Sequence, residues 1–299
     1  MKAIVTWSLK NMILISKSLR EIFDWESFKG FLGQFERVAV KPNLCTVAPP
    51  PATTELGFIK NIVCELESKG KSVFIVESDQ ATATGDLKAK RLGFKDLNVP
   101  FVNMTIELGS KRVEPQEVDD FFEKQRSGLI SLAVPKATDI GYFTCATKNL
   151  FGLLPTKYKG KYHNRIHGVI RELGDALGHR TLSIIDCRMG MEDKGSPVRG
   201  RVVNMPEFYV AGTNPLEIDK WIAVNVCGFN LDNIPYLQEL PDTNISGLEV
   251  FERLKVQCHK IGCFRPAALT LGKRAYYWVW ENLDNPLLSP IRAARSLTK

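Results

Sequence analysis

The chain has 299 residues, of which 44% are apolar and 24% charged, so it can bury a large hydrophobic core without disulfides or a structural metal ion. Its formal net charge of +7 favours acidic partners but does not identify one. No apolar run approaches the roughly 18 residues that a membrane-spanning helix needs, so we expect no transmembrane segment.

The N-terminal residues are apolar in patches, but Lys10 and Lys17 interrupt them and no small-residue cleavage pattern follows. We therefore expect no secretory signal. The first elements that the pattern predicts are a helix over residues 18–35 and a short apolar strand over residues 37–40.

Short apolar runs rich in β-branched residues alternate with helical stretches along most of the chain. A helix over residues 55–69 has one apolar stripe and ends at Gly70, as helices often do. The same pattern predicts strands over residues 72–78, 99–104, 129–134, 181–186 and 207–210, and helices over residues 86–92, 115–124, 163–177 and 216–226. This alternation predicts an α/β fold with a mainly parallel sheet and helices on both faces.

The alternation weakens after Leu240, where aromatic, proline and basic residues are mixed. We therefore predict an α/β core domain over residues 1–239 and a C-terminal appendage over residues 240–299 that packs on this core. Pro286 and Pro290 interrupt any continuous amphipathic helix in the last residues, which favours packing over attachment to a lipid surface.

The seven cysteines are odd in number and scattered, and most lie within apolar runs. This usage is typical of reduced thiols in a cytosolic protein, so we expect a cytoplasmic location. Closely spaced cysteine ligands are missing, so we expect no intrinsic iron–sulfur cluster. The pattern leaves open whether the protein binds a metal ion.

Lysines follow two of the predicted strands directly, at Lys41 and Lys136. In open α/β sheets, ligands bind beyond the carboxyl ends of the strands, where a low dielectric constant strengthens the pull of an ammonium group on a carboxylate or phosphate. The alternative is that each lysine pairs with a strand-end carboxylate, Glu77 or Asp186, for structural reasons alone.

The segment from Val134 to Arg171 contains seven lysine or arginine residues and a single acid, Asp139. Within it, Lys148 and Asn149 precede a Leu-Phe-Gly sequence, which sets a cation and an amide beside an apolar anchor. This pair is suited to orienting an oxygen-bearing substrate, although Asn149 is equally suited to bracing a loop.

His163 stands near the start of the helix predicted over residues 163–177. A helix N-terminus disfavours the imidazolium form, so His163 is a candidate general base beside a bound anion; the alternative is a histidine that only satisfies a helix end. Glu77, Asp186 and Asp79 follow strands and are suited to orienting a lysine, to acting as a base or to binding a divalent ion. Asp219 lies within a predicted helix and is the weakest of these carboxylate candidates.

Residues 188–201 form a polar segment with three glycines and three arginines, which we predict to be a loop. It has neither a Walker motif nor a dinucleotide-binding fingerprint. Arg199 is a candidate for clamping an anion from a mobile lid, and the alternative is a solvated connection.

Several motifs follow one another in a recognisable order: Lys41-Pro-Asn43, Pro-Lys136, the Lys-Asn-Leu-Phe-Gly string that begins at Lys148, a Tyr-His pair ending at His163, and IIDCRMGMEDKGSPVRG. Over about residues 37–228 this series resembles the domain of unknown function 362 family. The resemblance implies an architecture and a site, but no activity. Two features differ from the family: a Lys-Thr-His-like stretch is replaced by PKATDIG, and the ferredoxin-like cysteine motifs of many relatives are missing.

We predict an enzyme that binds a small anionic metabolite, a carboxylate or a phosphate. The substrate-binding candidates are Lys41, Asn43, Lys136, Lys148, Asn149 and Arg199, and the candidates for proton transfer are His163, Asp186 and Glu77. Two alternatives stay open. One is a redox-linked protein that works with a separate iron–sulfur partner, and the other is a nucleic-acid-binding protein, which we disfavour because only two tyrosines accompany the basic run. The sequence does not specify a reaction class or an oligomeric state.

Overall fold

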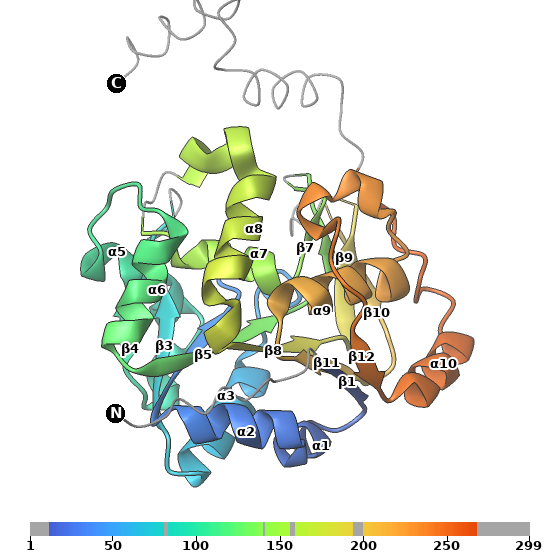
Figure 1. The fold of residues 1–299 in the computed structure, drawn as a ribbon, viewed down its shortest axis with the longest axis horizontal. Helices are drawn as coiled ribbons and strands as arrows, with labels where there is room; N and C mark the ends of the chain where they lie inside the picture. The colour runs from blue at the N-terminus through green and yellow to red at the C-terminus, as the bar shows by residue number, and fades with distance from the viewer. Residues whose placement is uncertain (1–11, 81–82, 140, 156–158, 194–199, 268–299) are drawn as a thin grey trace, which may run out of the picture.

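The computed structural model describes residues 12–80, 83–139, 141–155, 159–193 and 200–267. Its main sheet has eight strands: β1 (Met12–Ser16), β2 (Arg37–Pro42), β3 (Ser72–Glu77), β4 (Phe101–Asn103), β5 (Ser127–Ala133), β8 (Thr181–Asp186), β11 (Tyr209–Gly212) and β12 (Asn244–Ser246). They are ordered β12-β1-β11-β8-β5-β2-β3-β4 (Figure 1). Strands β4, β3, β2, β5 and β8 run parallel, and β11 is antiparallel to both of its neighbours.

Helices cover both faces of this sheet (Figure 1). One face carries α1 (Leu19–Asp24), α2 (Glu26–Gln34) and α3 (Leu56–Ser68), and the other carries α6 (Pro115–Lys124), α7 (Ala146–Leu150), α8 (Ile166–Leu177) and α9 (Pro215–Trp221). Side chains alternate along β2, so that Val38 and Val40 pack with the first group whereas Ala39 packs with the second. The predicted α/β class, with a mostly parallel sheet, is confirmed.

The remaining helices are short or peripheral. They are α4 (Gly85–Arg91), α5 (Met104–Glu107), α10 (Leu248–Gln257), the 3-10 helices η1 (Phe94–Leu97), η2 (Phe151–Leu153), η3 (Lys159–Arg165), η4 (Gly178–Arg180), η6 (Leu231–Asn233) and η7 (Pro235–Leu237), and the π-helical turn η5 (Ile222–Val226).

A second sheet, which the sequence did not predict, lies beyond the carboxyl ends of the parallel strands. It consists of β6 (Lys136–Ala137), β7 (Phe143–Thr144), β9 (Met189–Glu192) and β10 (Arg201–Asn204), in the order β10-β9-β6-β7. The prediction of a loop over residues 188–201 was therefore wrong at both ends, which pair as an antiparallel hairpin. Gly190 serves close packing there, because an added Cβ would lie 2.7 Å from the Phe264 ring.

Several predicted boundaries also differ. The helix expected over residues 18–35 is two helices, separated at Trp25 by an extended backbone. The helix expected over residues 163–177 begins at Ile166, because Arg165 leaves the helical region with φ −140° and ψ 36°. His163 therefore lies in η3 and not at the N-terminus of an α-helix. Strand β1 was missed because its continuous apolar run does not distinguish a strand from a buried helix.

The described part of the C-terminal region contacts the sheet and its helices. Strand β12 pairs with β1, and the Phe251 ring of α10 lies 4.8 Å from the Trp221 ring. Further along, the Arg265 guanidinium donates to the buried carboxylate of Glu192 on β9. Residues 268–299 lie outside the described part, and they are more than half of the C-terminal appendage predicted over residues 240–299. None of the described helices is long and apolar enough to cross a bilayer.

Candidate functional site

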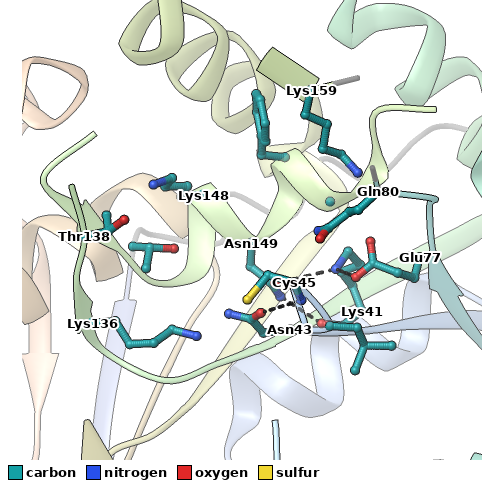
Figure 2. Close-up of a pocket in the computed structure, with 14 residues that line it drawn as sticks. Lys41, Asn43, Cys45, Glu77, Gln80, Lys136, Thr138, Lys148, Asn149 and Lys159 are labelled. Atoms are coloured by element: carbon teal, nitrogen blue, oxygen red, sulfur yellow. Dashed lines mark hydrogen bonds and ion pairs between the residues drawn. The ribbon is translucent and has the colours of Figure 1, made fainter. Parts of the chain in front are cut away.

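A cavity of about 160 Å³ lies beyond the carboxyl ends of the parallel strands (Figure 2). Strand β2 ends at Pro42 between β3 and β5, so the residues that follow these three strands meet at one edge of the sheet. The lining residues are Lys41, Asn43, Leu44, Cys45, Glu77, Gln80, Lys136, Thr138, Thr144, Lys148, Asn149, Phe151, Gly152 and Lys159. The described lining therefore brings four lysines and one carboxylate around a single space.

Lys41 and Glu77 form a buried ion pair on one side of the cavity. Lys41 Nζ lies 3.0 Å from Glu77 Oε2, and both side chains are 1% exposed. Lys41 Nζ also donates to the carbonyl oxygen of Pro42 at 2.7 Å. Burial alone would raise the pKa of Glu77, but the ammonium groups of Lys41, Lys88 and Lys159 outweigh it and hold this pKa below its usual value. The carboxylate thus stays ionised and neutralises Lys41.

Asn149 joins the ends of two strands from its place on α7. Its Nδ2 atom donates to the carbonyl oxygen of Lys41 at 2.9 Å and to Ser131 Oγ at 3.1 Å. The Asn149 amide oxygen accepts from Lys41 Nζ at 3.4 Å. The side chain therefore braces the cavity wall, which is the structural alternative considered for this residue, and it also lines the cavity.

Lys136 is 1% exposed and belongs to the short strand β6. Its Nζ atom donates to the carbonyl oxygen of Ala52 at 2.9 Å. Among the described residues, no carboxylate lies within ion-pairing distance of this ammonium group. Burial lowers the pKa of Lys136, because the charged form loses its hydration. A carboxylate or phosphate placed in the cavity would supply the missing counter-charge.

Lys148 is held by a helix that Asp219 anchors. The buried carboxylate of Asp219 accepts from the backbone N–H of Ala146 at 2.6 Å and of Thr147 at 3.0 Å, at the start of α7. Burial raises the pKa of Asp219 to about 7 in spite of these hydrogen bonds. Burial, together with repulsion from Lys136, lowers the pKa of Lys148 to about 7. Asp219 itself does not line the cavity.

Lys159 and Gly152 close the side of the cavity near Glu77. Lys159 Nζ donates to Ser78 Oγ at 2.6 Å and to the carbonyl oxygen of Asp79 at 3.1 Å. Burial lowers its pKa to about 7, although Glu77 opposes this shift. Gly152 permits the close approach of η2, since an added Cβ would lie 2.7 Å from Lys41 Nζ and 2.8 Å from Glu77 Oε1.

Three candidate residues do not line this cavity. Asp186, the last residue of β8, forms an ion pair with Arg188 at 2.7 Å. His163 lies outside the lining. Its Nδ1 atom is buried with no hydrogen-bond partner in the described part of the chain, and burial together with Lys148 lowers its pKa. Arg199 lies outside the described residues.

The structure also places residues at the cavity that the sequence analysis did not select. Those with polar or ionisable side chains are Cys45, Gln80, Thr138, Thr144 and Lys159. Cys45 stands two residues after the selected Asn43, and Lys159 belongs to the basic run, but neither has a motif that distinguishes it from a surface residue. In the described parts of the chain, no three histidine, cysteine or acidic side chains are grouped so as to hold a metal ion.

A family model described as "Domain of unknown function (DUF362)" matches residues 38–224 of the chain. Every residue that lines the cavity lies within the matched range. No curated protein and no solved structure matches the chain.

Proposed function

Because the chain belongs to the DUF362 family, whose description assigns no activity, we propose a function from the site itself: the protein binds a small anionic molecule in the lysine-lined cavity. The ligand class is a carboxylate or a phosphate. A space of about 160 Å³ suits a metabolite of a few carbon atoms and is too small for a polymer.

The observation that carries this proposal is the imbalance of buried charge around the cavity. Among the described residues that line the cavity, Glu77 is the one carboxylate, and it is paired with Lys41. Lys136 is buried as deeply, yet no described carboxylate pairs with it. Taking an ammonium group out of water costs on the order of several kcal/mol of free energy unless an opposite charge compensates it. A bound anion offers that compensation.

We further propose that the protein is an enzyme acting on this anion. Lys136 and Lys148 would hold the charged group, with Asn43 and Gln80 providing neutral hydrogen-bonding groups on the wall. Glu77 is the carboxylate best placed to act on the ligand, and its low pKa makes it an orienting group more than a strong base. His163 and Asp186 would act only through intermediate residues, because neither lines the cavity.

Isothermal titration with sulfate, phosphate and acetate tests the binding proposal directly. Lys136→Met removes one buried ammonium group at nearly constant volume, and Lys60→Met on the exposed surface of α3 is the matched control. We expect at least one anion to bind the wild type and Lys60→Met alike, and binding by Lys136→Met to fall at least about tenfold. Equal affinity in all three proteins would contradict the proposal.

Cysteine alkylation offers a second measurement on the unmodified chain. Cys45, Cys64 and Cys263 are all exposed, but Cys45 alone among them lines the cavity. A ligand in the cavity should therefore slow the reaction of Cys45 with iodoacetamide and leave Cys64 and Cys263 unchanged. The alternative is a nucleic-acid-binding function. It would be favoured if RNA bound in a salt-sensitive way, protected none of the three cysteines, and bound equally less well to Lys136→Met and to Lys60→Met.

A further inference from the structure

Resting on the proposed function, we infer that the ligand is a short dianion with an acidic group at each end, a dicarboxylate or a phosphorylated carboxylate, which bridges Lys136 and Lys159 across the cavity. The inference starts from where these two ammonium groups lie. Lys136 comes from β6 and Lys159 from η3, and they line opposite sides of the same space (Figure 2). A compact anion at one side would leave the ammonium group at the other side uncompensated.

Neutral oxygen atoms hold both ammonium groups in place. Lys136 Nζ donates to the carbonyl oxygen of Ala52 at 2.9 Å. Lys159 Nζ donates to Ser78 Oγ at 2.6 Å and to the carbonyl oxygen of Asp79 at 3.1 Å. Among the carboxylates that the structure describes, none lies within ion-pairing distance of either group. An ammonium group has three N–H bonds, so after these contacts each lysine keeps at least one donor for a ligand.

The two carboxylates nearest to Lys159 have other partners. Glu77 is ion-paired with Lys41 at 3.0 Å. Asp79 Oδ1 accepts from Asn103 Nδ2 at 2.8 Å, away from the cavity lining. Neither carboxylate therefore provides Lys159 with an ion pair of its own.

The positive charges form two separate groups. Besides burial, which is the larger cause, Lys136 lowers the pKa of Lys148, whereas Lys88 and Lys41 lower the pKa of Lys159. Since electrostatic repulsion falls with distance, each lysine is affected mainly by its own group. Figure 2 agrees, with Lys136 and Lys148 on one side and Lys41 and Lys159 on the other. A ligand with two separated negative charges matches this arrangement better than a single compact anion does.

Neutral side chains line the space between the two groups. Cys45 and Asn149 lie between Lys136 and Lys159 in Figure 2, and the apolar Phe151 also belongs to the lining. A few methylene groups can occupy this space without removing a charge from water. The cavity volume of about 160 Å³ limits how many of them fit.

Isothermal titration with malonate, succinate and glutarate tests the inference on the wild type. The monoamide of each diacid is the matched control ligand, because it has nearly the same size but a single carboxylate. Phosphoglycolate, compared with glycolate, extends the series to a phosphorylated carboxylate. The titrations are made at about pH 6.5, where Lys159 is mostly protonated.

We expect the affinity of the dianions to peak at one length. The best dianion should bind at least about tenfold more tightly than its control ligand, because it makes charge-assisted hydrogen bonds at both ends. This comparison does not depend on the folding of any variant.

Lys159→Met separates the inference from the proposed function. It should lower the affinity for the best dianion at least about tenfold and leave the affinity for acetate, which binds at Lys136, within about threefold. Lys159→Arg keeps the charge and should retain the preference for the dianion. Lys136→Met should weaken both ligands, and Lys60→Met on the exposed surface of α3 should weaken neither.

The results distinguish the failure of one proposal from that of the other. If the wild type binds acetate but no dianion more tightly than its control ligand, the inference is overturned and the binding proposal stands. The same holds if Lys159→Met weakens acetate and the dianion equally. If the wild type binds no anion of either kind, the binding proposal itself fails.

Discussion

Two lysines of the cavity, and a third whose charge acts on Glu77, are buried far more deeply than lysines usually are. Lys41, Lys88 and Lys136 are each 1% exposed. Lys41 is balanced by Glu77, and Lys88 donates to the carbonyl oxygen of Ser78 at 3.0 Å. A buried charge destabilises the fold unless it is paired. Removing a lysine that has a counter-charge should therefore lower the free energy of unfolding, whereas removing one without a counter-charge should raise it.

Lys136→Met should stabilise the protein by about 1 kcal/mol while weakening anion binding, because it removes a buried charge that no described carboxylate pairs with. Urea denaturation of wild type and variant without ligand measures the change. Loss of stability by more than about 1 kcal/mol would instead indicate that the hydrogen bond to Ala52 is a structural requirement.

Lys41→Met should have the opposite effect and destabilise the protein by about 3 kcal/mol, because Glu77 would lose its nearest counter-charge in the interior. The double variant Lys41→Met, Glu77→Gln removes both charges and should recover most of this loss. A double variant less stable than Lys41→Met, measured in the same denaturation experiment, would contradict this account.

At the scale of elements, the site depends on α7, a helix of five residues that carries both Lys148 and Asn149. So short a helix has little stability of its own, and it is held by contacts with its surroundings. Asp219 on α9 accepts hydrogen bonds from its first two backbone N–H groups, and Asn149 ties it to β2 and β5. Asp219, the weakest candidate in sequence, is therefore a positioning residue for Lys148.

Asp219→Asn should change how stability depends on pH. The pKa of Asp219 is about 7 in the fold and near 3.8 in an unfolded chain, so the folded state binds more protons between these values. The favourable contribution is present below about pH 4 and is lost as the pH rises to about 7. The stability of wild type relative to Asp219→Asn should therefore fall by a few kcal/mol from pH 4 to pH 7. If the difference in free energy of unfolding between the two proteins stayed constant from pH 4 to pH 7, the Asp219 carboxyl would not titrate in this range.

At the scale of the whole molecule, the cavity lies where the parallel sheet meets the second sheet. The ends of β2 and β3 provide Lys41 and Glu77, and the second sheet provides Lys136, Thr138 and Thr144 from β6, β7 and the turn between them. The site is therefore assembled from segments that lie far apart in the chain.

Sulfate binding should weaken as the pH rises from 6 to 8, by roughly tenfold, because Lys148 and Lys159 lose their protons through pH 7. Sulfate keeps its charge over this range, so any change comes from the protein. Titration calorimetry at constant ionic strength measures the effect, and Lys148→Met should show a shallower profile. Affinity that is independent of pH in the wild type would show that neither amine contributes.

The sequence by itself determined the fold class and the neighbourhood of the site. Alternating apolar runs and helical stripes predict a parallel sheet with helices on both faces, because each periodicity reflects how a strand or a helix buries its side chains. The rule that ligands bind beyond the carboxyl ends of parallel strands then selects Lys41, Lys136 and Glu77, which the structure brings around one cavity.

Only the tertiary structure decided which charges are paired and which residues complete the cavity. The Lys41–Glu77 pair and the hydrogen bonds of Asp219 join residues that lie far apart in the chain, and no local periodicity encodes such contacts. The second sheet was missed because its strands are two to four residues long, too short to show an alternation. His163 and Asp186 were predicted to belong to the site because they stand near the predicted ends of a helix and a strand. Whether a side chain reaches the cavity depends instead on how whole elements pack, which those ends do not reveal.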